Sequence, residues 1–400
     1  MKLQHSILLA LAVLLALIIS ISTPLLLNAA PHANYFVVTP YLQLGKSEQS
    51  DSFSINWISV SPDTKDLSCS YQIEPGGDWK SSSKIQRTLL NGRPDLNLFT
   101  AELSKLAEGK SVHYKVSLGS EILFESSFSS SPRANSPFKF DVLGDCGRGS
   151  HGEARIAAKL KEDNPPIALI TGDIVYTIGT VGFYLKNFFP YFNSSDAIGK
   201  ERGSAIMQST VFVGCAGNHD IASGGYMDAR NLDVAPDSMS YFTLFDQPLN
   251  GPISKAGPNT PQLYGSKQHI DRFLEAAGPK FPRMANFWFE YGDAHFLVLD
   301  GNEYMDWTDP SLRDWVEKNL KKAKTTWKFV LFHQPGFNSD VGHREEQRMR
   351  HLADVFERTG VDVCFSGHSH SYQRSMPLHF SVTKNPDKKE EREIRMGYVP

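Results

Sequence analysis

Two different hydrophobic patterns divide the chain. From about Tyr35 to Ser130, apolar and polar residues alternate in short runs such as "SFSINWISV", "LSCSYQI" and "SVHYKVSLGS", and turn sequences such as "PGGD" separate them. Alternation with period two places every second side chain on one face of a strand, and short strands at this spacing are typical of an antiparallel β-sandwich. We therefore expect an all-β domain over residues 31–131.

The pattern changes after the polar, proline-containing linker "SSSPRANSP". Apolar strand-like runs now alternate with helical segments, among them "EARIAAKLKED", a helix beginning at Asp309-Pro310 and running to Ala323, and "EEQRMRHLADVFERTG", which Gly360 closes. Strands interleaved with helices predict an α/β layered domain, which we place at residues 136–400. We expect at least one further strand beyond the final "MGYVP", so that this domain continues past residue 400.

The N-terminal segment has the pattern of a targeting sequence. It carries one early lysine, an apolar block from Ile7 to Ile21, Pro24, and the small residues Ala29 and Ala30. Residues 1–30 are therefore predicted to be a signal peptide or, if uncleaved, an N-terminal anchor. We expect the rest of the chain to be secreted or extracytoplasmic, with any membrane contact made through this segment alone.

Charge and cysteine content exclude several classes. The formal net charge of −3 provides no basic field for a nucleic-acid backbone, so we expect no nucleic-acid partner. Four cysteines in 400 residues do not make a disulfide framework. Cys215 and Cys364 lie in apolar runs and Cys146 follows a tight "LGD", so buried free thiols are expected.

Five of the predicted strands in the second domain end on side chains that bind metal ions. The blocks are "GDCG" with Asp145, "GDIVY" with Asp173 and Tyr176, "GNHD" with Asn218 and His219, "VLFH" with His333, and "GHSH" with His368 and His370. In layered α/β folds, sites form beyond the carboxyl ends of the strands. A glycine stands directly before four of the ligand positions, where the chain leaves the sheet. These residues are therefore predicted to form one shared site.

The donor types indicate which ions the site takes. Nitrogen, carboxylate, amide and phenol donors without a thiolate argue against a zinc-finger site and favour a hydrolytic pair of metal ions. A carboxylate can bridge two ions, and Asp173 is the candidate because Tyr176 follows it by three residues. A phenol has a pKa of about 10 in water, so its ligation as phenolate requires a strongly acidic cation such as ferric iron.

The five blocks, in this order, resemble the signature of the purple acid phosphatases, which are calcineurin-like metallophosphoesterases. Tyr176 separates this family from other metallophosphoesterases. In the first domain, Leu103, Leu106, Gly109 and Tyr114 have the spacing of the corner turn of a fibronectin type III domain, which implies that the Tyr114 hydroxyl bonds to the backbone. The resemblance implies a central β-sandwich flanked by helices, preceded by a fibronectin III-like sandwich.

The resemblance also implies a division of the ligands between two ions. Ferric iron would be held by Asp145, Asp173, Tyr176 and His370. A divalent ion (Zn, Mn or Fe) would be held by Asp173, Asn218, His333 and His368. The first set carries two carboxylates and a phenolate for a 3+ ion, whereas the second adds only neutral donors to the shared carboxylate.

Three further residues are candidates for catalysis. The resemblance places His219 beside the substrate, as a donor to phosphate or as the acid for the leaving group, and Asp220 could orient it. Family members often carry two adjacent histidines after the "VLFH" block, and here Gly342 and His343 stand at that place. His343 is therefore the second candidate for substrate contact, with an ordinary loop histidine as the alternative.

The function that the resemblance implies is acid phosphatase activity, in which a metal-bound hydroxide attacks small-molecule phosphate monoesters. A phosphodiesterase or nucleotide hydrolase on the same scaffold is the alternative, because the metal blocks specify phosphoester chemistry but not the class of ester. A surface interaction protein with an inactive hydrolase domain is a further alternative, against which the complete set of ligands argues. The sequence gives no indication of the oligomeric state.

Overall fold

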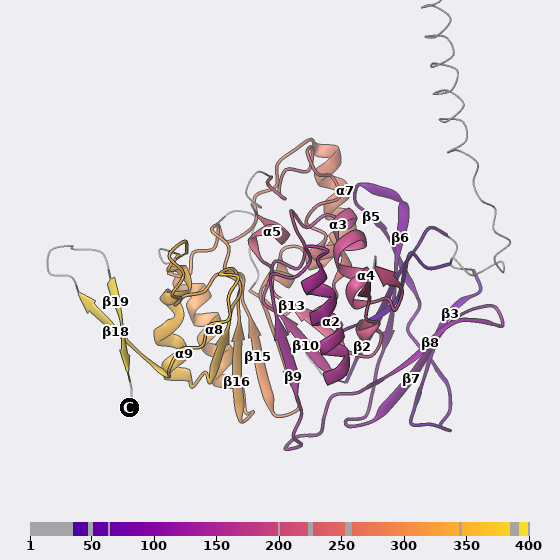
Figure 1. Ribbon diagram of the computed structural model, residues 1–400, viewed down its shortest axis with the longest axis horizontal. Coiled ribbons are helices and arrows are strands. Elements are labelled where there is room, and N and C mark those ends of the chain that lie inside the picture. Colours follow the sequence, from indigo (N-terminus) through magenta and orange to yellow (C-terminus); the bar gives the residue numbers. More distant parts are fainter. Residues whose placement is uncertain are drawn as a thin grey trace, which may run out of the picture. The chain divides into compact units, whose positions relative to one another are not determined.

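The computed structural model describes residues 35–46, 51–62, 65–198, 201–222, 227–252, 258–343, 346–384 and 392–398. The described residues from Phe36 onward belong to one unit (Figure 1). The predicted signal peptide or anchor, residues 1–30, lies outside the described residues, and the boundary between residues 131 and 136 stays a prediction. Among the helices of the described ranges, none is both long and apolar enough to cross a membrane.

The first part of this unit consists of two antiparallel four-stranded sheets, as the alternating pattern predicts. In spatial order, the first sheet is β1 (Val38–Gln43), β2 (Phe53–Ser59), β6 (Arg93–Leu103) and β5 (Gln86–Leu90), and the second is β4 (Lys80–Ser81), β3 (Leu67–Ile73), β7 (Ser111–Leu118) and β8 (Glu121–Ser129). On β7, the alternate residues Val112, Tyr114 and Val116 are fully buried. The strand period of two therefore places one face of each sheet in the core.

Tyr114 has the structural role expected of it, because its hydroxyl bonds to the backbone. Its ring is buried, and its hydroxyl donates to the carbonyl of Gln208, 2.9 Å away, in η2 (Ile206–Gln208). The backbone partner that the corner-turn spacing implies is therefore present. In this chain β8 packs against η2, which brings an unrelated carbonyl within reach of the hydroxyl.

The second part contains two further sheets, whose strands are mostly parallel. One is β13 (Val211–Gly214), β10 (Ile167–Ile170) and β9 (Phe140–Leu143), and the other is β14 (Phe287–Tyr291), β15 (Ala294–Val298), β16 (Trp327–Leu331) and β17 (Val363–Phe365). Phe140 of the first sheet contacts the rings of Phe296, Phe329 and Phe365 of the second, at centroid distances of 5.4, 5.3 and 6.0 Å. The two sheets therefore face each other across an aromatic core.

Helices cover the outer faces of this sandwich (Figure 1). Ala154, Ala157 and Leu160 of α2 (His151–Asp163) share a core cluster with residues of β10. On the other sheet, α8 (Pro310–Lys322) and α9 (Ala353–Thr359) pack in a second cluster with β15 and β16. The α/β layered domain is thus confirmed, with helices on both faces of a central β-sandwich.

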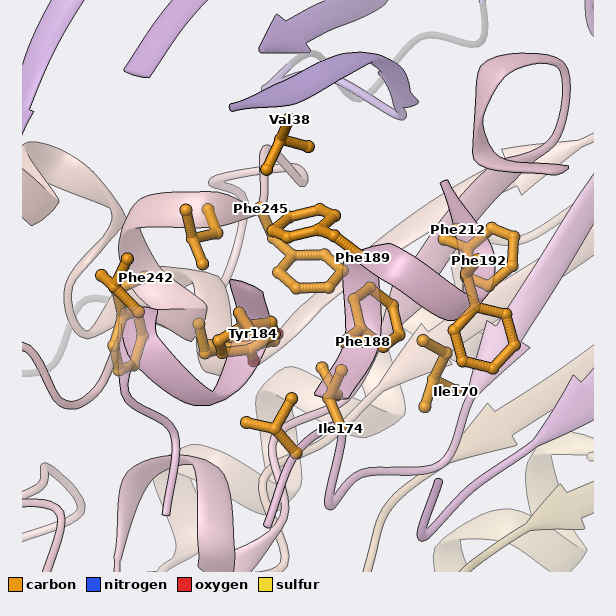
Figure 2. Close-up of a cluster of buried hydrophobic side chains, with 14 of the residues drawn as sticks. Val38, Ile170, Ile174, Tyr184, Phe188, Phe189, Phe192, Phe212, Phe242 and Phe245 are labelled. Carbon is orange, nitrogen blue, oxygen red and sulfur yellow. The ribbon is translucent and has the colours of Figure 1, made fainter. Parts of the chain in front are cut away.

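The first cluster also joins the two parts of the unit. It is rich in aromatic rings, and Val38 of β1 lies over Phe189 and Phe245 (Figure 2). The remaining elements are α3 (Val181–Phe183), η1 (Tyr184–Phe188), α4 (Phe189–Phe192), β11 (Ala197–Ile198), β12 (Glu201–Arg202), α5 (Asn218–Ile221), α6 (Tyr241–Leu244), α7 (Lys267–Ala277), η3 (Gly278–Lys280), η4 (Arg283–Ala285), η5 (Arg348–Leu352), β18 (Leu378–Lys384) and β19 (Arg392–Tyr398).

Two local expectations need correction. The helix predicted to end at Gly360 is divided into the 3₁₀ segment η5 and the shorter α9, although Gly360 closes it with a left-handed φ of 72°. The strand "VCF" is exposed rather than buried, because β17 is an edge strand that pairs with β16 alone within the described residues. All four cysteines are free, as expected, but Cys364 is exposed with this strand and Cys146 is only partly buried.

Candidate metal centre

The carboxyl ends of the strands bring the predicted ligands together. Parallel pairing aligns the last residues of three strands, Leu143, Ile170 and Gly214, and aligns Leu331 with Phe365 in the other sheet. Asp145, Asp173 and Asn218 follow the first three strands, and the three ligand histidines follow the other two. Both sheets therefore deliver polar side chains to one edge of the sandwich, as the sequence predicts.

Glycine is required before some of the ligands because side-chain atoms of other ligands approach its Cα closely. A Cβ atom on Gly217 would lie 2.2 Å from Asp173 Oδ1, and one on Gly367 would lie 2.6 Å from Asp145 Oδ2. Gly172 has a φ of +89°. The ligands that follow also adopt left-handed backbone, with φ of 52° at Asp145 and 49° at Asp173. Such conformations cost energy and cluster at functional sites.

The first group of donors surrounds Asp145. Single ligand atoms of Asp145, Asp173 and His370 lie within 4.8 Å of one another. The Tyr176 hydroxyl donates to Asp145 Oδ1 at 3.1 Å and lies 3.0 Å from His370 Nε2. The donors predicted for ferric iron are therefore adjacent, and the phenol oxygen lies between a carboxylate and an imidazole.

The second group shares Asp173 with the first. Ligand atoms of Asp173, His333 and His368 also lie within 4.8 Å of one another. His333 Nε2 is 3.2 Å from Asp173 Oδ1 and 3.2 Å from His368 Nδ1. His333 Nδ1 lies 2.7 Å from the carbonyl of Thr171, which fixes the ring so that Nε2 faces the site. A carboxylate common to both groups has the position that a bridging ligand needs.

The electrostatics of these groups fit a positively charged occupant. Although burial would lower it, the carboxylates of Asp173 and Asp145 raise the pKa of His333 to about 9. Burial and the same two carboxylates raise the pKa of Tyr176 far above its ordinary value. Without a metal ion, His333 therefore takes up a proton and Tyr176 keeps its own, since the site holds more negative charge than its histidines balance. Metal cations would satisfy the same demand.

Asn218 and His219 occupy the start of α5, beside Asp173. The backbone N–H of His219 donates to Asp173 Oδ1 at 2.9 Å. The centroid of the His219 ring lies 4.5 Å from that of the Tyr176 ring. His219 Nδ1 faces the carbonyl of Thr177, and Nε2 lies 3.7 Å from Asp173 Oδ2. His219 therefore reaches the group of ligands from its side.

Asp220 does not orient His219, contrary to the expectation. Its buried carboxylate accepts from the backbone N–H groups of Gly217 at 2.9 Å and Ile174 at 3.1 Å. The Thr177 carbonyl takes the place beside His219 Nδ1 that was expected for Asp220. Asp220 thus fixes the two ligand-bearing loops to each other, because one carboxylate binds both backbones.

His343 is also at the site, and it brings a residue that the sequence reasoning missed. Its ring centroid lies 4.1 Å from that of His368. Glu346 Oε1 is 2.9 Å from His343 Nδ1, and Glu346 Oε2 is 3.0 Å from His368 Nε2. The sequence offered one signal for Glu346, which is its position three residues after the candidate His343. A loop spacing of this kind carries little information by itself.

Comparison with known proteins agrees with this geometry. Residues 138–372 match the family model of the calcineurin-like phosphoesterases, a span that includes every predicted ligand. The chain belongs to the calcineurin-like phosphoesterase family. The shared site of two donor groups lies within the part of the chain that matches this family.

Within this family the chain is similar to purple acid phosphatases. Purple acid phosphatase 18 of Arabidopsis thaliana is 23% identical over 250 residues, which cover 61% of this chain and 46% of the relative. Purple acid phosphatase 23 of the same plant is 26% identical over 269 residues, 62% of this chain and 50% of the relative. The chain thus spans about half the length of these relatives.

The fold is similar to that of a solved purple acid phosphatase. The structure of the enzyme from yellow lupin (Lupinus luteus) seeds superimposes with a TM-score of 0.59 at 17% identity, over 86% of this chain and 60% of that one. This likeness extends over both the antiparallel sheets and the metallophosphoesterase domain, since it covers most of the chain. It confirms the predicted fold class.

Proposed function

We propose that the protein is an acid phosphatase that hydrolyses small-molecule phosphate monoesters at a dinuclear Fe(III)–M(II) centre, where M is Zn, Mn or Fe. The observation that carries this proposal is the position of the Tyr176 hydroxyl, about 3 Å from both Asp145 and His370. The names of its relatives support the reaction class. They include an acid phosphatase of Aspergillus ficuum, 26% identical over 40% of this chain and 31% of that protein.

The ligand sets follow the two donor groups. Asp145, Asp173, Tyr176 and His370 would hold the ferric ion, and Asp173, Asn218, His333 and His368 the divalent ion. When bound, the ions would supply Lewis acidity toward the phosphoryl oxygens and a nucleophile derived from water. Thr171 holds His333 in the tautomer that leaves Nε2 free to bind, since its carbonyl can only accept.

His219 and His343 are the proposed substrate contacts. In each, a fixed acceptor faces Nδ1, the Thr177 carbonyl for His219 and the Glu346 carboxylate for His343. An acceptor there keeps the proton on Nδ1, so Nε2 donates when the ring is a cation. Such a ring can donate to a phosphoryl oxygen and can pass a proton to the leaving alkoxide. Asp220 is proposed to hold the loops and to take no part in proton transfer.

The visible absorption spectrum tests the proposal. The iron-loaded protein is expected to show a broad band, because a phenolate bound to ferric iron absorbs visible light by charge transfer. Tyr176→Phe, which removes only the phenol oxygen, should abolish the band. A colourless wild type that binds zinc or manganese instead would contradict the ferric assignment and leave the family assignment in place.

The class of ester needs a separate measurement. A phosphodiesterase or nucleotide hydrolase would use the same metal ligands, because phosphoester chemistry at a dinuclear site does not by itself select the ester. The rates on a phosphomonoester and on its bis-ester, measured at one pH, separate the two functions. A faster rate on the bis-ester would replace the phosphomonoesterase proposal.

We also propose that the catalytic domain begins near residue 136 and acts outside the cytoplasm. The support is in the sequence, where a proline-containing linker precedes residue 138, and residues 1–30 have the pattern of an export signal or anchor. Detergent extraction and N-terminal sequencing of the natural protein would separate a cleaved signal from an anchor.

A further inference from the structure

A cation lies against the tyrosine of the candidate metal centre. The guanidinium carbon of Arg148 is 4.2 Å from the centroid of the Tyr176 ring. Arg148 follows Asp145 by three residues, in the loop "GDCGRG". None of the assignments above gives this side chain a role.

The backbone fixes Arg148 beside Tyr176. Gly147, the preceding residue, donates to the carbonyl of Ile174 at 3.0 Å and accepts from the N–H of Tyr176 at 2.9 Å. The Arg148 side chain is exposed, and among the described residues its guanidinium forms no hydrogen bond or ion pair. The ring contact is therefore the principal interaction of the guanidinium, and the loop bonds hold the backbone of Arg148 near that of Tyr176.

This contact bears on the electrons that Tyr176 would give to a metal ion. A cation over an aromatic face is attracted by the electron density of the ring. The attraction increases when the ring becomes a phenolate, because its negative charge is delocalised over the ring. The same field lowers the energy of the π electrons, so the phenolate becomes a weaker donor. The imidazole rings of His219 and His370 also contact the Tyr176 ring, His219 in a tilted and His370 in a T-shaped arrangement.

We propose that Arg148 is a positioning residue that tunes the donor strength of Tyr176 toward the ferric ion. This role rests on the proposed function, because it requires a phenolate bound to iron. In this role Arg148 acts through the ring of Tyr176, over which its guanidinium lies. The prediction concerns the energy of the charge-transfer band, which a purely structural role for Arg148 would leave unchanged.

The test compares absorption maxima of iron-loaded wild type, Arg148→Met and Arg148→Lys, with iron content measured in each. In Arg148→Met the donor electrons rise in energy, so the band should move to longer wavelength. Arg148→Lys keeps the charge, and its band should lie between those of wild type and Arg148→Met. Lys115→Met is the matched control, since it removes a cation 4.0 Å from the Trp79 ring in the β-sandwich and should not move the band.

The outcomes separate this inference from the proposed function. A coloured wild type whose band does not move in Arg148→Met, at equal iron content, would overturn the role of Arg148 and leave the phosphatase proposal intact. Loss of iron in Arg148→Met, with an unmoved band in the loaded fraction, would also overturn it in favour of a structural role. A colourless wild type would refute the ferric phenolate itself, and the tuning with it.

Discussion

At the scale of single residues, the candidate metal ligands could be predicted because they follow apolar strands and because a glycine stands directly before four of them. The groups that contact the histidines of the site could not be predicted. Thr177 rather than Asp220 faces His219, and Glu346 joins His343 to His368. These contacts depend on loop backbone in left-handed conformations, as at Asp145 and His368, which sequence spacing does not specify.

Glu346 provides the first test at this scale. Its carboxylate accepts from His343 and contacts His368, so Glu346→Gln keeps the shape and removes the charge. Residues that orient ligands and substrate contacts typically contribute 10–100-fold, so we expect kcat/KM to fall about 10-fold or more. Steady-state kinetics with metal analysis check this. The control is Glu357→Gln, which neutralises a similar carboxylate. Glu357 lies in α9 and contacts His379, and its substitution should leave kcat/KM unchanged.

At the scale of elements, the start of α8 was predicted from its capping signal, whereas the helix of α2 was predicted only from Glu153 onward and without its cap. α2 begins with a capping box formed by Ser150 and Glu153, and α8 begins after Asp309, which accepts from Ser311 N–H. The helix predicted to end at Gly360 has a clear C-terminal signal but no capping signal at its start. In the structure it is divided into η5 and α9. Caps satisfy backbone groups locally, so they can be predicted from sequence, whereas a 3₁₀ segment depends on tertiary contacts.

The capping glutamate of α2 predicts a pH-dependent stability. Glu153 accepts from Gly149 and Ser150 N–H, and burial raises its pKa to about 7, above about 4.3 for an unfolded glutamate. Folding then favours the protonated form, so this contribution to stability is present below pH 4.3 and is lost as pH rises through 7. Glu153→Gln should gain about 1–3 kcal/mol relative to wild type between pH 4.5 and pH 8.

Urea unfolding at the two pH values measures this difference. Glu162→Gln serves as the control, because Glu162 is exposed on the same helix and, within the described part of the chain, pairs with Lys159 alone. Its effect on the free energy of unfolding should be the same at both pH values within about 0.5 kcal/mol. A constant difference between Glu153→Gln and wild type would mean that folding does not change the pKa of Glu153.

At the scale of the whole molecule, the two halves were predicted from their different hydrophobic periods, but their joint core was not. Residues of β1 and β2 enter the aromatic cluster of the metallophosphoesterase domain, as Val38 does in Figure 2. In addition, Tyr114 bonds to Gln208. Periodicity assigns a residue to the inside of its own element. It does not specify which distant element completes the core, so the packing of one half on the other had to come from the structure.

Asp246 is the polar centre of this contact. Its carboxylate accepts from Asn56 of β2 at 2.8 Å, and its backbone N–H donates to Gln43 of β1 at 3.0 Å. Lys280 lies 3.3 Å from the same carboxylate, and both side chains are buried. Although burial opposes ionisation, Lys280 holds the pKa of Asp246 below its ordinary value. The buried ion pair of Asp246 and Lys280 therefore lies at the contact between the two halves, where the sandwich binds Asp246 through Asn56 and Gln43.

Breaking this pair should destabilise the whole unit. In Asp246→Asn the hydrogen bonds to the sandwich can persist, but Lys280 becomes a buried charge without a counter-ion, which costs about 3–5 kcal/mol. The double variant Asp246→Asn/Lys280→Met removes both charges and should recover part of this loss, since no unpaired charge remains. Urea unfolding followed by fluorescence checks both variants. A loss below about 1 kcal/mol in Asp246→Asn would mean that Lys280 reaches water or releases its proton.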